Sequence, residues 1–134
     1  MARLSDIEGI GGVYEGKLNV AGIETVEEYL AACRTSANRE ALSEKTDISV
    51  TLILEWANHA DLYRIKGIGS EYADLLEEAG VDTVPELAQR NPENLHKKLK
   101  EINDEKDLVR RLPGEGEVAD WIAQAKQLPR ALEY

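Results

Sequence analysis

The sequence contains few of the residues that form disulfides, bind metals or cross membranes. Its 134 residues include one cysteine, Cys33, and two histidines, which argues against an internal disulfide and a cysteine-based zinc site. Phenylalanine is absent, and no apolar run approaches the length of a membrane span. The first six residues do not have the pattern of a secretory signal. We therefore expect a cytoplasmic protein that makes no membrane contact.

Positive charge is also scarce. Sixteen Lys and Arg residues face twenty-six Asp and Glu residues, so the net charge is −10. This sign opposes nucleic-acid binding, because affinity for a polyanion comes mainly from cations that displace its counterions. Hydrophobic residues make up 43% of the chain and charged residues 31%, a balance typical of a globular protein. The length predicts a single domain over residues 1–134.

Signatures of catalysis are missing too. The sequence has no phosphate-binding loop of the Walker type and no nucleophile elbow. His59 and His96 lie far apart and lack the spacing of metal ligands. We expect that the protein is not an enzyme, and that it binds no cofactor and no metal.

An internal repeat is the strongest feature that is present. Ile7-Glu8-Gly9-Ile10-Gly11 has a second copy in Ile65-Lys66-Gly67-Ile68-Gly69, 58 residues later, and Ala21-Gly22 and Thr25-Val26 recur at the same offset as Ala79-Gly80 and Thr83-Val84. A constant offset over several matched pairs indicates a structural unit used twice. We assign residues 4–64 to the first repeat with its connecting helix and residues 65–129 to the second.

Apolar residues recur at helical spacing along the chain, and no stretch alternates as a strand does, so the predicted fold is all-α. Thr25 with Glu28 and Thr83 with Glu86 have the spacing of capping boxes, which predicts two matched helix starts. Further helices are expected over residues 39–45 with Ala41 and Leu42 inward, after Ser49, from Ser70 to Ala79, over residues 92–103 and around residues 118–128, with a short turn or helix near residues 108–112.

The aromatic residues repeat with the glycines. Trp56 and Trp121 occupy similar local contexts, and Tyr14 and Tyr72 follow the two glycine pairs at the same distance. Helical spacing places these side chains on buried faces, so we predict that they anchor the core of each repeat. Cys33 is expected to fill a small apolar space near a helix end.

A helix, a tight Gly-x-Gly turn and a second helix form the helix-hairpin-helix pattern. Such a turn leaves amides exposed at a helix N-terminus, where the helix dipole favours an anion such as phosphate. Two turns on one body would hold two phosphates of a duplex without reading its sequence.

The strings Ile-x-Gly-Ile-Gly-x-x-Tyr-x-x-x-Leu and Ala-Gly-[Ile/Val]-x-Thr-Val resemble tandem helix-hairpin-helix proteins. The whole chain, from Leu4 to Pro129, resembles a small stand-alone bacterial family of this kind that is catalogued as a domain of unknown function. Residues 54–62, 90–95 and 109–113 look characteristic of it. The resemblance implies two pseudo-symmetric repeats packed into one compact helical domain.

The candidate nucleic-acid-binding residues are the two turns and the cations beside them: Gly9, Ile10, Gly11, Lys17, Arg64, Lys66, Gly67, Ile68, Gly69 and Ser70. Glu15 and Glu71 depart from the pattern, because they put acids where small or basic residues help a DNA-binding hairpin.

One basic concentration lies elsewhere, and it forms a secondary candidate patch: Lys97, Lys98, Lys100, Arg110 and Arg111. Interleaved acids give pairs such as Lys97 with Glu101 and Lys100 with Asp104 on neighbouring helical turns. A solvated, salt-bridged face is the more economical interpretation of this stretch.

Two functions fit these observations. The first is a non-enzymatic module that binds the backbone phosphates of double-stranded DNA through both hairpins, without sequence specificity. The alternative is an acidic protein–protein interaction adaptor that has lost DNA binding and recognises a basic partner. The hairpin pattern favours the first function, whereas the net charge and Glu71 favour the second.

Overall fold

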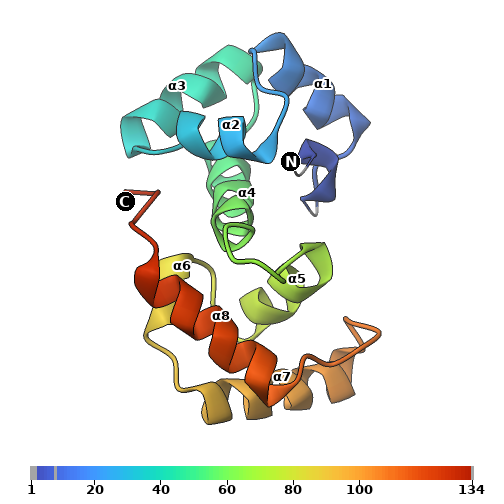
Figure 1. The fold of residues 1–134 in the computed structure, drawn as a ribbon. Coiled ribbons are helices and arrows are strands. Elements are labelled where there is room, and N and C mark those ends of the chain that lie inside the picture. The colour runs from blue at the N-terminus through green and yellow to red at the C-terminus, as the bar shows by residue number, and fades with distance from the viewer. Residues whose placement is uncertain (1–2, 8, 134) are drawn as a thin grey trace. The chain divides into compact units, whose positions relative to one another are not determined.

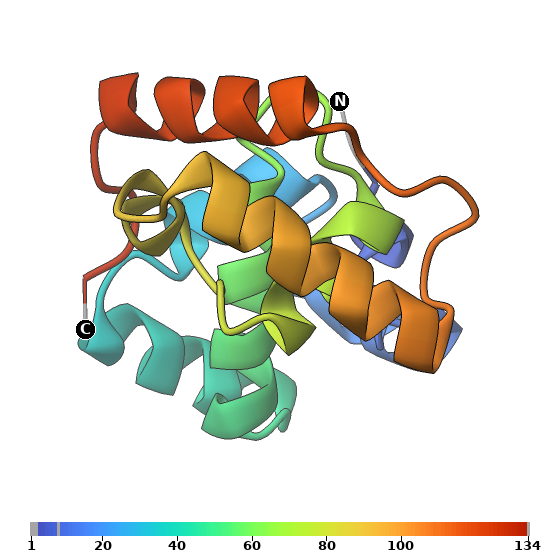
Figure 2. The same ribbon diagram turned by 90° about the horizontal axis from the view of Figure 1, so that it is seen from below.

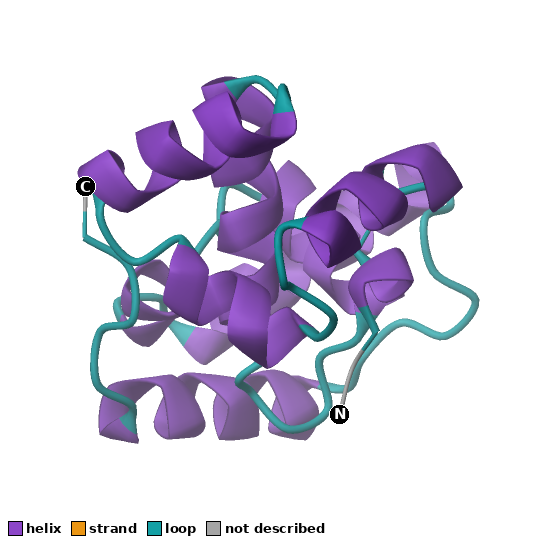
Figure 3. Cartoon of the chain, turned by 90° about the horizontal axis from the view of Figure 1, so that it is seen from above, coloured by secondary structure: helices purple, strands orange, loops and turns teal. Residues whose placement is uncertain are grey.

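The computed structural model describes residues 3–7 and 9–133. Over these residues the chain is all-α, with eight α-helices, one short 3-10 helix and no strand, as Figure 3 shows. This confirms the all-α part of the predicted fold class. None of the described helices is long and apolar enough to span a membrane. Glu8, which belongs to the first glycine motif of the sequence, lies outside the described residues.

The chain divides into two units. Figure 1 labels the helices that belong to them. Unit 1 comprises Met1–Asp61 and Arg130–Tyr134, and unit 2 comprises Leu62–Pro129. Unit 1 contains η1 (Leu4–Asp6), α1 (Gly12–Val20), α2 (Val26–Ala32), α3 (Ser36–Thr46) and α4 (Val50–Leu62), whose last residue begins unit 2. Unit 2 contains α5 (Ser70–Glu78), α6 (Val84–Ala88), α7 (Pro92–Lys106) and α8 (Glu115–Gln127).

Side-chain caps fix where the helices of unit 1 begin. The Thr25 hydroxyl accepts a hydrogen bond from the Glu28 amide, and the Glu28 carboxylate accepts one from the Thr25 amide, which confirms the first capping box. Ser49 caps α4 as predicted. Thr35 caps α3, so this helix begins at Ser36, before the predicted Arg39. Ala41 is exposed and not inward, because Arg39 and Leu42 occupy the buried face of α3.

The helix starts of unit 2 are predicted less well. Asn91 caps α7, but the Thr83 side chain makes no cap hydrogen bond, so the second predicted capping box is wrong. The Glu86 carboxylate instead lies 3.7 Å from the Arg90 guanidinium. Ser70 is the first residue of α5 and not its cap, which is Gly69.

The C-terminal part of unit 2 also differs from the prediction. α7 extends to Lys106, three residues past the predicted end, and Asp107 then ends it in a left-handed conformation with φ of 51°. Residues 107–114, where a turn or short helix was expected, contain no helix. Val109 is nevertheless anchored, because the Asn103 side-chain amide bonds both its amide and its carbonyl oxygen.

Within unit 2, α8 packs against α6 and α7, and α5 packs against α7. Figure 2 shows α8 in red beside α7 in orange. The core between these helices is aliphatic apart from Trp121; its largest fully buried side chains include Leu62, Ile65, Leu75, Leu76 and Trp121. This packing fixes the start of α5, where the second glycine motif lies.

The two glycine motifs have matching geometry. Gly9 and Gly67 have φ of 95° and 100°, in the left-handed region that glycine adopts without strain. The Ile10 amide donates to the Ile7 carbonyl, and the Ile68 amide donates to the Ile65 carbonyl. We call Gly9, Ile10 and Gly11 the first glycine turn, and Gly67, Ile68 and Gly69 the second.

A buried tryptophan packs against the first glycine of each turn. An ideal Cβ built on Gly9 would lie 3.0 Å from the Trp56 Nε1 atom, and one built on Gly67 would lie 2.9 Å from the Trp121 Nε1 atom. Both tryptophans are buried. Each tryptophan ring also contacts a tyrosine of the helix that follows the glycine turn. The ring centroids are 5.1 Å apart for Tyr14 and Trp56, and 5.2 Å apart for Tyr72 and Trp121. The predicted burial is confirmed for Trp56 and Trp121, whereas Tyr14 and Tyr72 are half-buried.

Gly67→Ala should destabilise unit 2. The new methyl group would meet the indole at 2.9 Å, and alanine is strained at a φ of 100°. Strain and overpacking together predict a loss of about 2–4 kcal/mol in the free energy of unfolding, measured by urea denaturation with circular dichroism.

Gly116→Ala is the matched control for Gly67→Ala. Gly116 lies inside α8 with no atom within 4 Å of its ideal Cβ, so alanine there should be neutral or stabilising by up to about 1 kcal/mol. Equal stability of Gly67→Ala and wild type would contradict the tight glycine–tryptophan contact.

Candidate functional site

Both glycine turns present backbone to solvent. Their four glycines are exposed, whereas the central residues, Ile10 and Ile68, are buried beneath them. The isoleucine anchors each turn on its own unit and leaves the outer surface without side chains. An external group can therefore approach the backbone closely at these two places.

The helices that follow the two turns begin without a side-chain cap. The helices α2, α3, α4 and α7 each have a hydroxyl or amide oxygen that accepts a hydrogen bond from an N-terminal amide. Glycine occupies the corresponding position of α1 (Gly11) and α5 (Gly69), so no side chain can do this. The open space around the ideal Cβ positions of Gly11 and Gly69 leaves these helix starts accessible.

In α5 the first amide with an acceptor inside the helix is that of Ala73, which donates to the Gly69 carbonyl at 2.9 Å. The amides of Ser70, Glu71 and Tyr72 precede it and have no acceptor within the helix. The positive end of the helix dipole lies at the same place. This arrangement can accept an anion, and the first turn presents the same amides in Gly12, Val13 and Tyr14.

Two predicted cations flank the second turn in different ways. Lys66 is exposed, and its backbone amide and carbonyl both bond the Gln124 side chain, at 2.9 and 3.1 Å. Its ammonium group has no hydrogen bond or ion pair among the described residues. Arg64 instead donates to the Pro129 carbonyl. Lys66 is therefore the better placed of the two to meet an incoming anion.

The loop over residues 107–114 brings a further cation to the second turn. Arg110 lies with its Nε atom 3.9 Å from the Glu71 carboxylate, in the first turn of α5. The Tyr72 hydroxyl donates to the Arg111 carbonyl at 3.0 Å, which ties the same loop to the same helix turn. From the sequence alone, Arg110 and Arg111 are expected to belong to a separate basic patch. Nothing in the spacing indicated this contact, because it depends on the course of an irregular loop.

Arg111 holds this loop in place. Its guanidinium makes two hydrogen bonds to the Glu117 carboxylate, at 2.8 and 3.0 Å, and the Gly114 amide donates to the same carboxylate at 3.2 Å. These hydrogen bonds lower the pKa of Glu117 from 4.5 to about 2, and the bond from Arg111 has the largest effect. The same pairing raises the pKa of Arg111. Arg111 thus has a local role at the start of α8.

The first turn is less basic. Lys17 lies on α1 with its Nζ atom 5.9 Å from the centre of the Tyr14 ring, a cation–π contact. Glu15, in the first turn of α1, is half-buried and has no ion pair among the described side chains. An acid here opposes an anion at the adjacent amides, so the two turns are not equivalent electrostatically.

Lys97, Lys98 and Lys100 are exposed on α7. The predicted pairs of Lys97 with Glu101 and Lys100 with Asp104 do not form, and these three lysines have no ion pair among the described residues. Their side chains extend into solvent from a well-packed helix whose Leu95 and Leu99 are buried. The face is therefore solvated, as expected, but these lysines form no salt bridge with the described residues.

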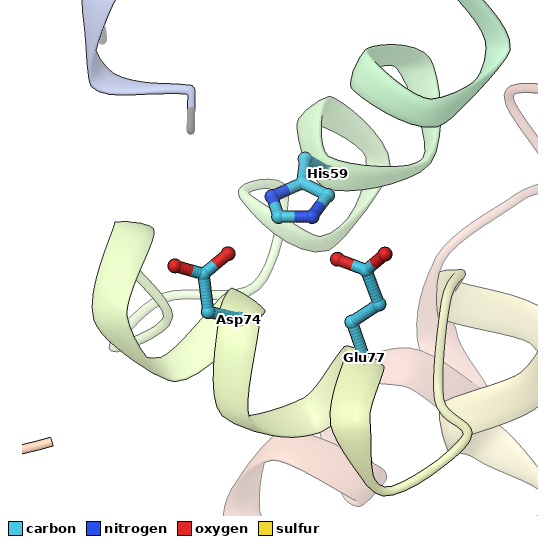
Figure 4. A group of neighbouring side chains, drawn as sticks. All are labelled: His59, Asp74 and Glu77. Atoms are coloured by element: carbon cyan, nitrogen blue, oxygen red, sulfur yellow. The ribbon is translucent and has the colours of Figure 1, made fainter. Parts of the chain in front are cut away.

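Two acidic side chains of α5 lie close to cations of unit 2. The Glu78 carboxylate accepts a hydrogen bond from Lys106 at 2.6 Å, and Glu71 lies near Arg110. Asp74 and Glu77 project from one side of α5, and His59 lies near the end of α4, as Figure 4 shows. Neither unit taken alone contains three described His, Cys, Asp or Glu side chains grouped closely enough to hold a metal ion.

The family of the chain follows from a comparison with known protein families. The chain matches the family described as "Domain of unknown function (DUF4332)" over residues 8–128. This is most of the chain, and the protein belongs to that family. Comparisons with curated proteins and with solved structures each gave no significant match.

The lowered pKa of Glu117 predicts how pH affects the loop that carries Arg110. A carboxylate with a depressed folded-state pKa stabilises the fold above its unfolded value, and this contribution is lost as the pH falls through the folded value. We expect the Arg111–Glu117 contact to persist from neutral pH to about pH 4.5 and to be lost towards pH 2. Side-chain carboxyl NMR should give a midpoint of about 2 for Glu117.

Arg111→Gln is the variant that tests the cause. It should move the Glu117 midpoint back towards 4.5, although the Gly114 amide should still hold it below that value. A wild-type midpoint near 4.5 would contradict the described contact.

Proposed function

We propose that the protein is a non-enzymatic tandem helix-hairpin-helix module that binds the backbone phosphates of double-stranded DNA without sequence specificity. In this proposal η1 and α1 flank the first hairpin turn, and the end of α4 and α5 flank the second. The observation that carries the proposal is the pair of exposed glycine turns, each of which leads into a helix without a side-chain cap.

The second turn is the stronger candidate for phosphate. The amides of Ser70, Glu71 and Tyr72 are accompanied by the Arg110 guanidinium and by the Lys66 ammonium, which has no ion pair within residues 3–7 and 9–133. Glu71 opposes an anion, but its proximity to Arg110 reduces the net charge at this place. In unit 1 Glu15 has no ion pair with any described cation, so we expect the first turn to contribute less.

Three exposed lysines of α7 would provide a second, weaker attraction for the DNA phosphates. Lys97, Lys98 and Lys100 make no ion pair among the described residues and are free to approach phosphates. Such contacts would add affinity that depends on salt but not on base sequence.

Gly69→Asp tests whether the amides of the second turn bind duplex. Asp is a favoured N-cap residue, and space is open at this position, so the variant should fold. Its carboxylate would accept from the amides of α5 and repel phosphate. We expect about tenfold weaker binding of a fluorescein-labelled duplex, measured by fluorescence anisotropy at about 50 mM salt.

Gly116→Asp is the matched control for Gly69→Asp. It adds the same charge in the first turn of another helix of unit 2, where the ideal Cβ position is also open. The proposal predicts little change for this variant. Equal weakening by both would show a general effect of charge, and no weakening by Gly69→Asp would remove the second turn from the mechanism.

The alternative function is the protein–protein interaction adaptor. One surface favours it specifically: α1 exposes Val13 and Val20, which are 75% and 89% exposed, together with the small residues Gly12 and Gly16. Together with the net charge of −10, this surface would suit a basic partner with an apolar anchor. Absence of duplex binding by the wild type at about 50 mM salt, where phosphate contacts are strong, would favour the adaptor.

A further inference from the structure

Residues 130–133 return to unit 1 after the chain has completed unit 2. We call them the return segment. The Glu133 amide donates to the Arg34 carbonyl at 2.8 Å, and the Arg34 Nε atom donates to the Glu133 carboxylate at 3.0 Å. One residue of the segment therefore pairs with one residue of unit 1 through both main chain and side chain.

Arg39 makes the third connection. Its guanidinium donates to the Cys33 carbonyl at 2.8 Å and to the Glu133 carbonyl at 2.9 Å, and the residue is buried. A buried guanidinium is costly unless its donors are satisfied. Its bond to Glu133 thus links the return segment to the C-terminal end of α2, where Cys33 lies.

Leu132 is the apolar anchor of the segment. It is only 2% exposed, whereas its neighbour Glu133 is exposed and Ala131 is half-buried. The Arg130 Nε atom donates to the Leu132 carbonyl at 2.9 Å and folds the segment back on itself. A single buried leucine, flanked by main-chain bonds and a charged pair, is the contact pattern of a short docked peptide.

The contact is specific but small. Burial of one leucine stabilises the contact only modestly, and exposed ion pairs contribute little. Arg34 and Glu133 are mostly exposed, with side-chain exposures of 60% and 56%, so their pair fixes the register more than it adds affinity. A contact of this size can open while the helices of unit 1 remain folded.

We propose that the return segment is a displaceable internal ligand, and that the surface of unit 1 formed by Cys33, Arg34 and Arg39 is a peptide-docking site for a leucine followed by an acidic residue. When its own segment leaves, the site accepts the same segment of a second copy of this chain. Leu132 supplies the anchor, Glu133 pairs with Arg34, and Arg39 binds the main chain of either occupant. This inference does not rest on the proposed binding of DNA.

A vacated site tests the proposal. Leu132→Asp in the full chain should release the segment, and the probe is a fluorescein-labelled peptide of residues 128–134. We expect the peptide to bind the variant at least about tenfold more tightly than it binds the wild type, whose site is occupied. A peptide with Leu132→Asp is the matched control and should not bind. Absence of binding to the folded variant, or equal binding to variant and wild type, would overturn the proposal.

A charge exchange tests the register and provides a second variant. Arg34 is exposed, so Arg34→Glu should leave unit 1 folded while weakening the docked segment. Added to the Leu132→Asp chain, Arg34→Glu should weaken binding of the natural peptide, and a peptide with Glu133→Arg should restore it. Failure of the exchanged peptide to bind better than the natural one would remove the Arg34–Glu133 pair from recognition.

The alkylation rate of the Cys33 thiol is a label-free measure of whether the return segment is docked. The thiol is fully buried, and burial raises its pKa to about 11, so it should react slowly with an alkylating reagent in the wild type. Leu132→Asp should speed the reaction, and added natural peptide should slow it again. A rate that the peptide leaves unchanged at saturating concentration would contradict docking beside Cys33.

Exchange between copies has its own measurement. The Leu132→Asp chain offers a vacant site, and the Arg34→Glu chain offers a loosened segment, so an equimolar mixture should form a 1:1 complex by analytical ultracentrifugation. Each variant alone should remain monomeric. Absence of the complex at concentrations where the peptide binds would overturn the exchange between copies.

Discussion

The fold around each candidate site depends on the contact between a glycine and the edge of a buried tryptophan. Gly67 has a left-handed backbone, and the Trp121 indole leaves no room for a Cβ atom; Gly9 and Trp56 repeat this arrangement in unit 1. Each tryptophan also packs on a tyrosine in the first turn of the helix that follows the glycine turn: Trp56 on Tyr14 of α1, and Trp121 on Tyr72 of α5. The turn, the helix start and the core are thus fixed together, and the glycine backbone is presented to solvent as a consequence.

Charge decides how the two turns differ. The chain is strongly acidic, yet Glu78 is paired with Lys106, Glu71 lies near Arg110, and Glu117 is held by Arg111. These contacts pair acids close to the second turn, whereas Lys66, Lys97, Lys98 and Lys100 have no ion pair among the described residues. A net charge therefore says little about the local potential at one helix start. Among the described residues, the second turn has more cations near its open amides than the first, so we expect it to contribute more to the proposed phosphate binding.

Much of the fold follows from the sequence, because the deciding interactions are local. The 58-residue offset predicts the paired turns, and the caps at Thr25, Ser49 and Asn91 act within four residues of their own position. The errors arise where a distant or competing partner decides. Glu86 lies near Arg90, Arg110 reaches the second turn through an irregular loop, and Arg39 donates a hydrogen bond to Glu133, 94 residues away in sequence. The spacing of residues in the sequence does not predict such contacts.

Phosphate binding at the glycine turns can be tested by NMR titration of the ¹⁵N-labelled chain with a short unlabelled duplex at about 50 and about 200 mM salt. We expect the largest amide shifts at the lower salt for Ser70, Glu71 and Tyr72. Smaller shifts should occur at Gly12, Val13 and Tyr14, and all should shrink as salt screens the phosphates. Shifts confined to other surfaces, or none at the lower salt, would contradict phosphate binding at the glycine turns.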